Sequence, residues 1–142
     1  RWLWYKNNKT RNNLMKKKFL IVMANYYNEI SNGLLDSAIK TIPKKNLIKI
    51  IKVPGVFEIP VTISKNIKKY DAFLALGCVI KGQTPHFDFI SSATTNALMD
   101  LSIESKKPIG NAVITCLNYN QAKARKAKGK EAAKAVISVL SQ

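Results

Sequence analysis

The single histidine of the chain lies in a loop whose residue types suit anion binding and proton transfer. His86 follows the run Lys-Gly-Gln-Thr-Pro at positions 81–85. Histidine is the side chain whose unperturbed pKa lies near neutrality, so His86 is the natural candidate for a proton-transferring group. Thr84 is a favourable helix N-cap, and Pro85 suits the first helical position. The sequence therefore predicts a helix start that could hold a phosphate, with Lys81 nearby and His86 in the first turn.

A lone histidine is often no more than a half-buried residue at a helix start. Here the anion-binding character of the surrounding loop favours a functional role for His86. The positive end of the helix disfavours the imidazolium form, so we expect this side chain to be able to accept a proton.

Three further side chains have both a functional and an ordinary structural interpretation. Glu58 follows Pro54-Gly55 and could accept hydrogen bonds from substrate hydroxyls, or it could be a first-turn glutamate favoured by the helix dipole. Tyr26 could stack a flat heterocycle or simply pack locally. Arg125 is the only arginine after residue 11, and it could bind phosphate in a bidentate way or be an exposed helical cation. Residue type alone leaves these alternatives open.

Apolar runs and helical periodicity alternate along the chain. Short apolar runs predict four buried strands, and apolar side chains spaced three and four residues apart predict helices between them. Ser31 is a plausible N-cap for the first helix, and Gly129 marks a break between the last two. The predicted strands are 19–24, 47–53, 72–80 and 109–115, and the predicted helices are 31–42, 56–67, 84–103, 118–127 and 130–140.

This order of elements predicts an α/β fold. Strongly apolar strands that alternate with helices favour a four-stranded parallel sheet covered on both faces, which is a three-layer α/β/α sandwich. In such sheets ligands bind beyond the carboxyl ends of the strands. The loops after the four predicted strands carry polar or conformationally special residues, at 25–28, 54–58, 81–86 and 116–119. We therefore expect these four loops to form one rim around one site.

Composition narrows the class of protein. Of the 142 residues, 46% are hydrophobic, which is enough for one domain with a core. No apolar run reaches the roughly 18 residues of a membrane span. The chain has no second histidine, no CxxC pair and no acidic cluster, so we expect no metal site. With no signal-peptide pattern, we expect a cytoplasmic protein in which Cys78 and Cys116 are reduced packing residues.

The net charge of +16 raises the possibility of nucleic-acid binding, but the distribution of charge argues against it. Residues 1–18 hold seven basic side chains and no acidic one, whereas the remaining lysines are scattered over several predicted helices. We expect residues 1–14 to be a basic, disordered extension and 15–142 to be a single domain. An RNA-binding module is a further alternative, and its mark would be salt-dependent RNA binding that survives deletion of residues 1–14.

Three motifs resemble those of the lumazine synthase family of riboflavin biosynthesis. Residues 53–60 read Val-Pro-Gly-Val-Phe-Glu-Ile-Pro, similar to the family's proline-glycine-x-x-glutamate-isoleucine-proline segment. Residues 76–87 read Leu-Gly-Cys-Val-Ile-Lys-Gly-Gln-Thr-Pro-His-Phe, similar to its glycine-x-valine-isoleucine-basic-glycine-x-threonine-x-histidine-phenylalanine loop. Residues 118–125 resemble its glutamine-alanine…arginine helix. The similarity runs in order from Phe19 to Leu140.

The resemblance implies a flavodoxin-like arrangement of the sandwich and a transferase that needs no cofactor. Such an enzyme condenses 5-amino-6-(D-ribitylamino)uracil with 3,4-dihydroxy-2-butanone 4-phosphate into 6,7-dimethyl-8-ribityllumazine, and it releases phosphate and water. The resemblance also implies a homopentamer, or twelve pentamers in a hollow icosahedron, with the site between subunits. Riboflavin synthase is a candidate partner, and no nucleic acid or membrane is expected.

The resemblance also assigns roles to individual residues. His86 would shuttle protons. The ribitylaminouracil would be held by residues of the first three loops and of the last strand, namely Tyr26, Val56, Phe57, Glu58, Cys78, Val79, Ile80 and Asn111. The phosphate would be bound by residues of the third loop and, from a neighbouring subunit, of the last helical region, namely Lys81, Gln83, Thr84, Arg125 and Lys128.

The chain departs from the family pattern at several of these positions. Asn111 stands where many relatives carry an aromatic residue, Lys81 replaces a commoner arginine, and the connection from Arg125 to Gly129 is short. An alternative function on the same fold is a non-catalytic flavin- or riboflavin-binding protein. Such a protein would bind flavin tightly without releasing phosphate from the butanone phosphate.

Overall fold

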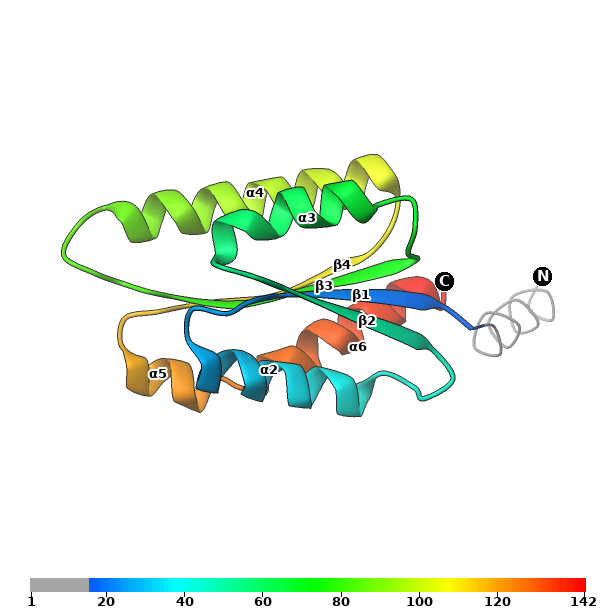
Figure 1. Ribbon diagram of the computed structural model, residues 1–142, viewed down its shortest axis with the longest axis horizontal. Helices are drawn as coiled ribbons and strands as arrows, with labels where there is room; N and C mark the ends of the chain where they lie inside the picture. Colours follow the sequence, from blue (N-terminus) through cyan, green and yellow to red (C-terminus); the bar gives the residue numbers. More distant parts are fainter. Residues whose placement is uncertain (1–15) are drawn as a thin grey trace.

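The structure is a computed structural model that describes residues 16–142, so the predicted extension at residues 1–14 lies outside the described residues. A central sheet of four parallel strands separates two layers of helices (Figure 1). The strands are β1 (Lys18–Ala24), β2 (Leu47–Val53), β3 (Ala72–Ile80) and β4 (Ile109–Cys116), in the spatial order β2-β1-β3-β4. The predicted α/β sandwich with a four-stranded parallel sheet is confirmed.

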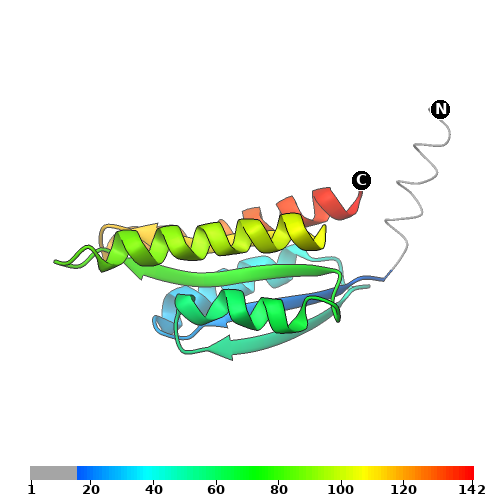
Figure 2. The ribbon, with the colours of Figure 1, turned by 90° about the horizontal axis from the view of Figure 1, so that it is seen from above.

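The helices divide between the two faces of the sheet. One face is covered by α3 (Ile59–Asn66), which follows the short 3-10 turn η1 (Val56–Glu58), and by α4 (His86–Ser105). The other face is covered by α2 (Asn28–Thr41), α5 (Tyr119–Ala124) and α6 (Lys128–Leu140) (Figure 1). Seen from above, α4 runs the length of the sheet with the shorter α3 beside it (Figure 2).

Alternation along the strands explains why the sheet needs both layers. In β1, Phe19, Ile21 and Met23 belong to the core under α2 and α6. Leu20 and Val22, between them, belong to the core under α3 and α4. Because successive side chains of a strand point to opposite faces, an apolar residue at every position requires a helix on each side. The edge strand β4 instead alternates buried and exposed residues, so part of one face is left open.

Three predicted helix boundaries are wrong. Helix α2 begins at Asn28, and Ser31 is a buried residue inside it, whose hydroxyl donates to the carbonyl of Ala24 at 2.6 Å. Helix α4 begins at His86 with Pro85 as its N-cap, so Thr84 does not cap it. The break between α5 and α6 falls at residues 125–127, and Gly129 is the second residue of α6. In the sequence, Ser31 and Gly129 have the residue types that are typical of helix ends. In the structure both lie inside a helix, where Ser31 bonds to the end of β1 and Gly129 packs against α2.

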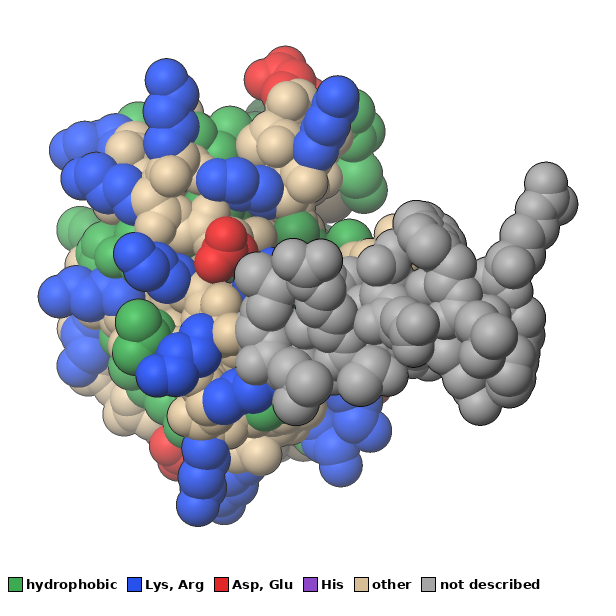
Figure 3. All heavy atoms as spheres, turned by 90° about the vertical axis from the view of Figure 1, so that its right-hand side faces the viewer, with side chains coloured by type: hydrophobic (Ala, Val, Ile, Leu, Met, Phe, Trp, Pro, Cys, Tyr) green, Lys and Arg blue, Asp and Glu red, His purple; other side chains and the backbone are tan. Residues whose placement is uncertain are grey.

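Two further features of the described residues are the character of their helices and the distribution of basic side chains at one end of the molecule. Among residues 16–142 no helix has the length and apolar character that crossing a membrane requires. On the end of the molecule that carries the C-terminus, lysine and arginine side chains are spread across the visible surface (Figure 3). On that face the positive charge is not gathered at one place.

Candidate active site

A cleft of about 610 Å³ opens at the carboxyl ends of β1, β2 and β3, at the left end of Figure 1. Its walls come from the three loops that follow these strands and from the first turns of α4. The lining residues are Tyr26, Tyr27, Gly55, Val56, Phe57, Glu58, Cys78, Val79, Ile80, His86 and Ile90. The chain connects β1 to β2 on one side and β3 to β4 on the other, so this cleft lies at the point where the strand order reverses. That point is where open α/β sheets bind ligands.

Two large aromatic side chains are exposed at the cleft. Tyr26 is 76% exposed and Phe57 is 65% exposed, and both line the cavity. The ring of Tyr26 meets that of Tyr27 edge-on, with centroids 4.9 Å apart and planes at 82°, and Tyr27 is itself half-buried. This contact supports Tyr26, and most of the Tyr26 side chain remains exposed. Exposed aromatic faces in a cleft suit the stacking of a planar heterocycle.

The end of β3 presents an unpaired backbone edge to the cleft. Strand β3 pairs with β1 only as far as Leu76, whereas its pairing with β4 continues to Ile80. From Gly77 onward, the edge of β3 that faces β1 therefore has no strand partner. Backbone N–H and C=O groups on such an edge bind a ligand as readily as another strand. Cys78, Val79 and Ile80 line the cleft along this edge, which matches the backbone role that the resemblance implies.

The start of α4 brings the histidine to the cleft. His86 is the first residue of the helix, it is exposed, and no side chain caps the helix start. The amide groups of an uncapped first turn are available to an anion. The preceding loop is tied to the sheet by the amide of Lys81, which donates to the carbonyl of Cys116 at 2.9 Å. Lys81, Gln83 and Thr84 are exposed in this loop but do not line the cleft.

Glu58 sits at the junction of η1 and α3 and is half-buried at the cleft wall. Its backbone carbonyl accepts a hydrogen bond from the Thr62 hydroxyl at 2.8 Å, which ties the residue to the first turn of α3. No side chain caps α3, so the Glu58 carboxylate is not used as a cap for this helix. That leaves it facing the cleft as a possible acceptor for hydroxyl groups.

The remaining predicted residues, on β4 and in the region that follows it, do not line the cleft. Arg125 and Lys128 line a separate groove of about 500 Å³ together with Thr115 and Glu131. Lys128 pairs with Glu131 at 2.8 Å, and this bond lowers the pKa of the Glu131 carboxyl. Asn111 is exposed on β4 and lines neither cavity, and its Oδ1 accepts from the amide of Val113 at 2.9 Å.

The expectation of one rim formed by four loops is therefore wrong for a single chain. Three loops line the cleft, whereas the loop after β4 contributes none of the lining residues; its Tyr119 ring centroid lies 6.2 Å from that of Tyr27. The basic residues that follow this loop open onto the second groove instead. The structure thus divides the predicted residues into a cleft and a basic groove, with the edge strand β4 between them.

Comparison with known proteins decides the family. A family model described as 6,7-dimethyl-8-ribityllumazine synthase matches residues 16–142. The chain belongs to this family. The protein of that name from Bartonella bacilliformis is 42% identical over 132 residues, which cover 86% of this chain and 87% of the relative. The proteins of the same name from Bartonella henselae and Nitrobacter hamburgensis are also similar to this chain. The first is 42% identical over 136 residues, which cover 89% of this chain and 88% of the relative. The second is 37% identical over 145 residues, which cover 93% of this chain and 89% of the relative. The resemblance to lumazine synthases is confirmed.

Three residues line the cleft of this lumazine synthase family member without having been predicted, namely Tyr27, Gly55 and Ile90. Ile90 follows His86 by four residues and so shares its helix face, a spacing that could have been used to find it. Tyr27 directly follows a predicted stacking residue. Burial, Tyr26 and the nearby Cys78 raise the pKa of the Tyr27 phenol, which keeps it a neutral hydrogen-bonding group.

The cysteine at the cleft wall is not a nucleophile of this lumazine synthase fold. Both Cys78 and Cys116 are free and buried. Burial, together with the neighbouring Cys116, raises the pKa of the Cys78 thiol to about 12. A thiol that stays protonated at neutral pH lacks the thiolate needed for attack. Cys78 therefore contributes its backbone and its packing volume to the cleft.

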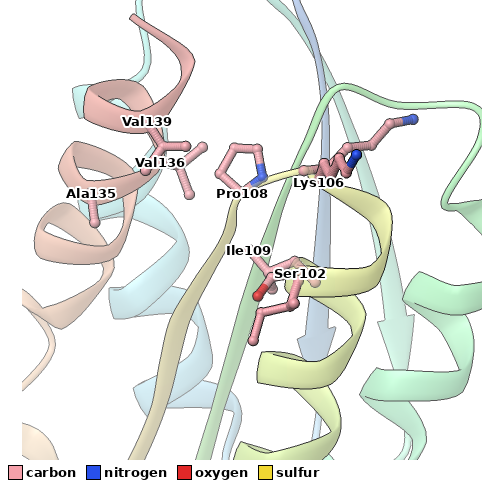
Figure 4. A pocket seen from close by; sticks show the side chains of 9 residues that line it. Ser102, Lys106, Pro108, Ile109, Ala135, Val136 and Val139 are labelled. Atoms are coloured by element: carbon pink, nitrogen blue, oxygen red, sulfur yellow. The ribbon is translucent and has the colours of Figure 1, made fainter. Parts of the chain in front are cut away.

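A third cavity, of about 390 Å³, lies at the opposite end of the sheet between the ends of α4 and α6 (Figure 4). Its lining is mostly apolar, with Pro108, Val136 and Val139 facing the space. One lysine on its wall, Lys107, donates to the carbonyl of Ile67 at 2.6 Å. This cavity is not lined by the residues for which the sequence predicts proton transfer and phosphate binding, namely His86, Lys81, Gln83, Thr84, Arg125 and Lys128. Among residues 16–142 no cluster of three or more His, Cys, Asp or Glu side chains could hold a metal ion.

Proposed function

We propose that the protein is a 6,7-dimethyl-8-ribityllumazine synthase. It would condense 5-amino-6-(D-ribitylamino)uracil with 3,4-dihydroxy-2-butanone 4-phosphate and release phosphate and water. One observation carries this proposal: in a chain of this family, His86 lines the same cleft as the exposed aromatic side chains and the free edge of β3. A planar substrate and a proton-transferring group can therefore meet at one place.

The cleft supplies what the ribitylaminouracil needs. Tyr26 would stack on the pyrimidine, and the free edge of β3 at residues 78–80 would hydrogen-bond its polar edge. Val56, Phe57 and Glu58 would hold the ribityl chain, the carboxylate of Glu58 accepting from its hydroxyls. This set of contacts is polar enough to orient the ring and apolar enough to exclude water from it.

The phosphate would be bound from two sides. The uncapped start of α4, with Gln83, Thr84 and Lys81 in the loop before it, offers amide, hydroxyl and ammonium groups. Arg125 and Lys128 open onto the other side of β4, so they serve a cleft only if a second copy of the chain brings them there. Asn111, exposed on the same strand, would reach the pyrimidine of that neighbouring site. The site would thus be shared between subunits of a homopentamer, alone or in an icosahedron of twelve pentamers.

The chemistry requires positioning and proton transfer. An amine of the pyrimidine attacks the ketone carbonyl, and water leaves as the C–N bond forms. A proton then leaves the neighbouring hydroxyl-bearing carbon, the C–O bond to the phosphate breaks with the phosphate taking the electron pair, and the resulting enol becomes a ketone. The second amine attacks this ketone, and a second water leaves as the new C–N bond closes the ring. His86 would take and return the protons of these steps, a contribution of about 10²–10⁴-fold. Holding both substrates in contact would contribute as much or more.

The proposal is tested by adding both substrates to the purified protein and following lumazine absorbance together with phosphate release. Appearance of both products at equal rates is the expected result. Tight flavin binding without phosphate release would instead support the alternative of a flavin-binding protein. We further propose a cytoplasmic location and riboflavin synthase as the protein that consumes the product, on the basis of family membership.

A further inference from the structure

One face of α2 holds the segment that carries Arg125. Residues 125–128, the basic limb, comprise the connection from α5 to α6 and the first residue of α6, and they lie against α2. Glu29, Gly33 and Ser37 follow one another at intervals of four residues, so they form one stripe along α2. We call these three residues the α2 seat. Each of them contacts the same residue of the limb, Lys126.

The three contacts fix Lys126 at its tip, its stem and its backbone. The Nζ atom pairs with Oε1 of Glu29 at 3.2 Å. The aliphatic stem crosses Gly33 so closely that a Cβ there would come within 2.5 Å of the Lys126 Cδ. The carbonyl oxygen accepts a hydrogen bond from the Ser37 hydroxyl at 2.9 Å. The side chain and the backbone of Lys126 are therefore both held by α2.

Glu29 also holds the helix on the other side of Arg125. Its Oε2 atom accepts a hydrogen bond from the Tyr119 hydroxyl, in the first turn of α5, at 2.9 Å. These two bonds and the nearby Lys123 lower the pKa of the Glu29 carboxyl. The carboxylate thus bridges α5 and the limb, and Arg125 lies between the two attachment points.

Arg125 itself has little that would fix its direction. Its side chain is exposed, and within the described part of the chain it donates one hydrogen bond, from Nη1 to the carbonyl of Thr115 at 3.5 Å. A bond of that length is weak. Bidentate binding of a phosphate by a guanidinium depends strongly on direction. The orientation of Arg125 must therefore come from the chain on either side of it, where Glu29 holds the side chains of Tyr119 and Lys126.

We propose that Glu29 is a positioning residue for phosphate binding: through Lys126 and Tyr119 it sets the direction in which Arg125 extends toward the neighbouring cleft. The inference rests on the proposed function, because it assigns the phosphate of the butanone substrate to Arg125. Removing the Glu29 charge would leave Arg125 in place but less well aimed. The affinity for the phosphate-bearing substrate would fall, whereas the affinity for the pyrimidine would not change.

Steady-state kinetics of Glu29→Gln test this. The amide oxygen still accepts from Tyr119, but the charge that holds Lys126 is gone. Because the pair is exposed, we expect a rise in the KM for the butanone phosphate of about two- to fivefold, with kcat and the KM for the pyrimidine within error of wild type. Glu104→Gln makes the same chemical change on the exposed end of α4 and should change nothing. The charge swap Glu29→Lys with Lys126→Glu restores a pair and should return the KM toward wild type.

Two results would overturn the proposal. One is an unchanged KM for the butanone phosphate in Glu29→Gln. The other is an equal rise in both KM values that the charge swap does not reverse, because a general loosening of the fold would do that. Titration of inorganic phosphate by calorimetry gives a readout that needs no turnover. Wild-type protein that binds phosphate but makes no lumazine would reject the proposed function. The phosphate affinities of wild type and Glu29→Gln would still decide the positioning role.

Discussion

Replacing Gly129 with alanine should loosen the helix pair that carries the basic groove. Gly129 lies in the first turn of α6, where that helix crosses α2. A Cβ at this position would run into the carbonyl oxygen of Leu34 and approach the Ser37 hydroxyl oxygen to 2.5 Å. The first obstacle is the helix backbone at the buried residue Leu34, so it cannot rotate away as a side chain could. The start of α6 must move instead, and Lys128 moves with it.

The magnitude follows from two opposing effects. Forcing an extra carbon into a packed interface typically costs about 1–3 kcal/mol. Alanine in place of glycine within a helix gains about 1 kcal/mol. Because the nearest obstacle is backbone, the upper part of the first range, about 2–3 kcal/mol, applies here. The net loss is then on the order of 1–2 kcal/mol, which for a domain of this size lowers the melting temperature by roughly 4–7 °C. The displaced start of α6 should also raise the KM for the butanone phosphate.

Thermal unfolding followed by far-ultraviolet circular dichroism, at equal protein concentrations, measures the first effect. Gly82→Ala is the matched control, since a Cβ at Gly82 would meet nothing within 4 Å and its backbone is not in the left-handed region. We expect that variant to melt within about 2 °C of wild type. If Gly129→Ala melts at the same temperature as the wild type, the close approach of α6 to α2 does not limit stability and the reasoning fails.

Three further substitutions probe the cleft and the groove. His86→Ala should lower kcat by about 10²–10⁴-fold while leaving measurable turnover; complete loss in a protein with a native circular dichroism spectrum would show that His86 does more than move protons. Arg125→Ala should raise the KM for the butanone phosphate and leave the KM for the pyrimidine unchanged, and Arg125→Lys should recover only part of the loss because it lacks the bidentate fork; equal KM values for all three proteins would remove Arg125 from the site. Burial raises the pKa of Cys78 to about 12, so its contribution to stability is present below the unfolded thiol pKa of about 8.5 and declines as the pH rises toward 12. Wild type should therefore lose more unfolding free energy between about pH 8.5 and 10 than Cys78→Ala does, as denaturant titrations at each pH would show; parallel curves would contradict the buried-thiol explanation.

The strands were the most predictable part of the fold. An unbroken apolar run is typical of a sheet covered on both sides, so residues 19–24 and 72–80 indicated central strands directly. Local signals also predicted three of the loops at the cleft. These local signals were enough to predict the strands and loops, because the apolar pattern of a strand and the polar residues of the loop after it are set by residues that are close together in the sequence.

Helix ends were less predictable, since the deciding partner is distant in the sequence. Ser31 has the residue type of an N-cap, yet its hydroxyl bonds to Ala24 because α2 begins one turn earlier. Gly129 has the residue type of a helix breaker, yet it lies within α6 because Leu34, 95 positions away, leaves no room for a side chain. A single sequence cannot show which far segment approaches a given residue.

The division between the cleft and the basic groove could not be worked out from residue types either. Which side of β4 the Arg125 segment occupies depends on the strand order and on how α5 returns over the sheet edge. Only the resemblance to lumazine synthases implied that Arg125 serves a neighbouring subunit. The single chain gives that implication a physical reason, because its own Arg125 opens onto a groove that its own cleft does not share.

Mixing two defective proteins would test the shared active site most directly. One partner carries Arg125→Ala, which damages only the groove, and the other carries His86→Ala with Phe57→Ala, which damages only the cleft. Dissociated and reassembled together in equal amounts, they should form intact sites at about a quarter of the subunit contacts. At a butanone phosphate concentration well below the KM of Arg125→Ala, lumazine production should then rise well above that of either protein alone. A mixture no more active than the sum of its parts, in assemblies shown to contain both chains, would contradict an active site completed by a second copy.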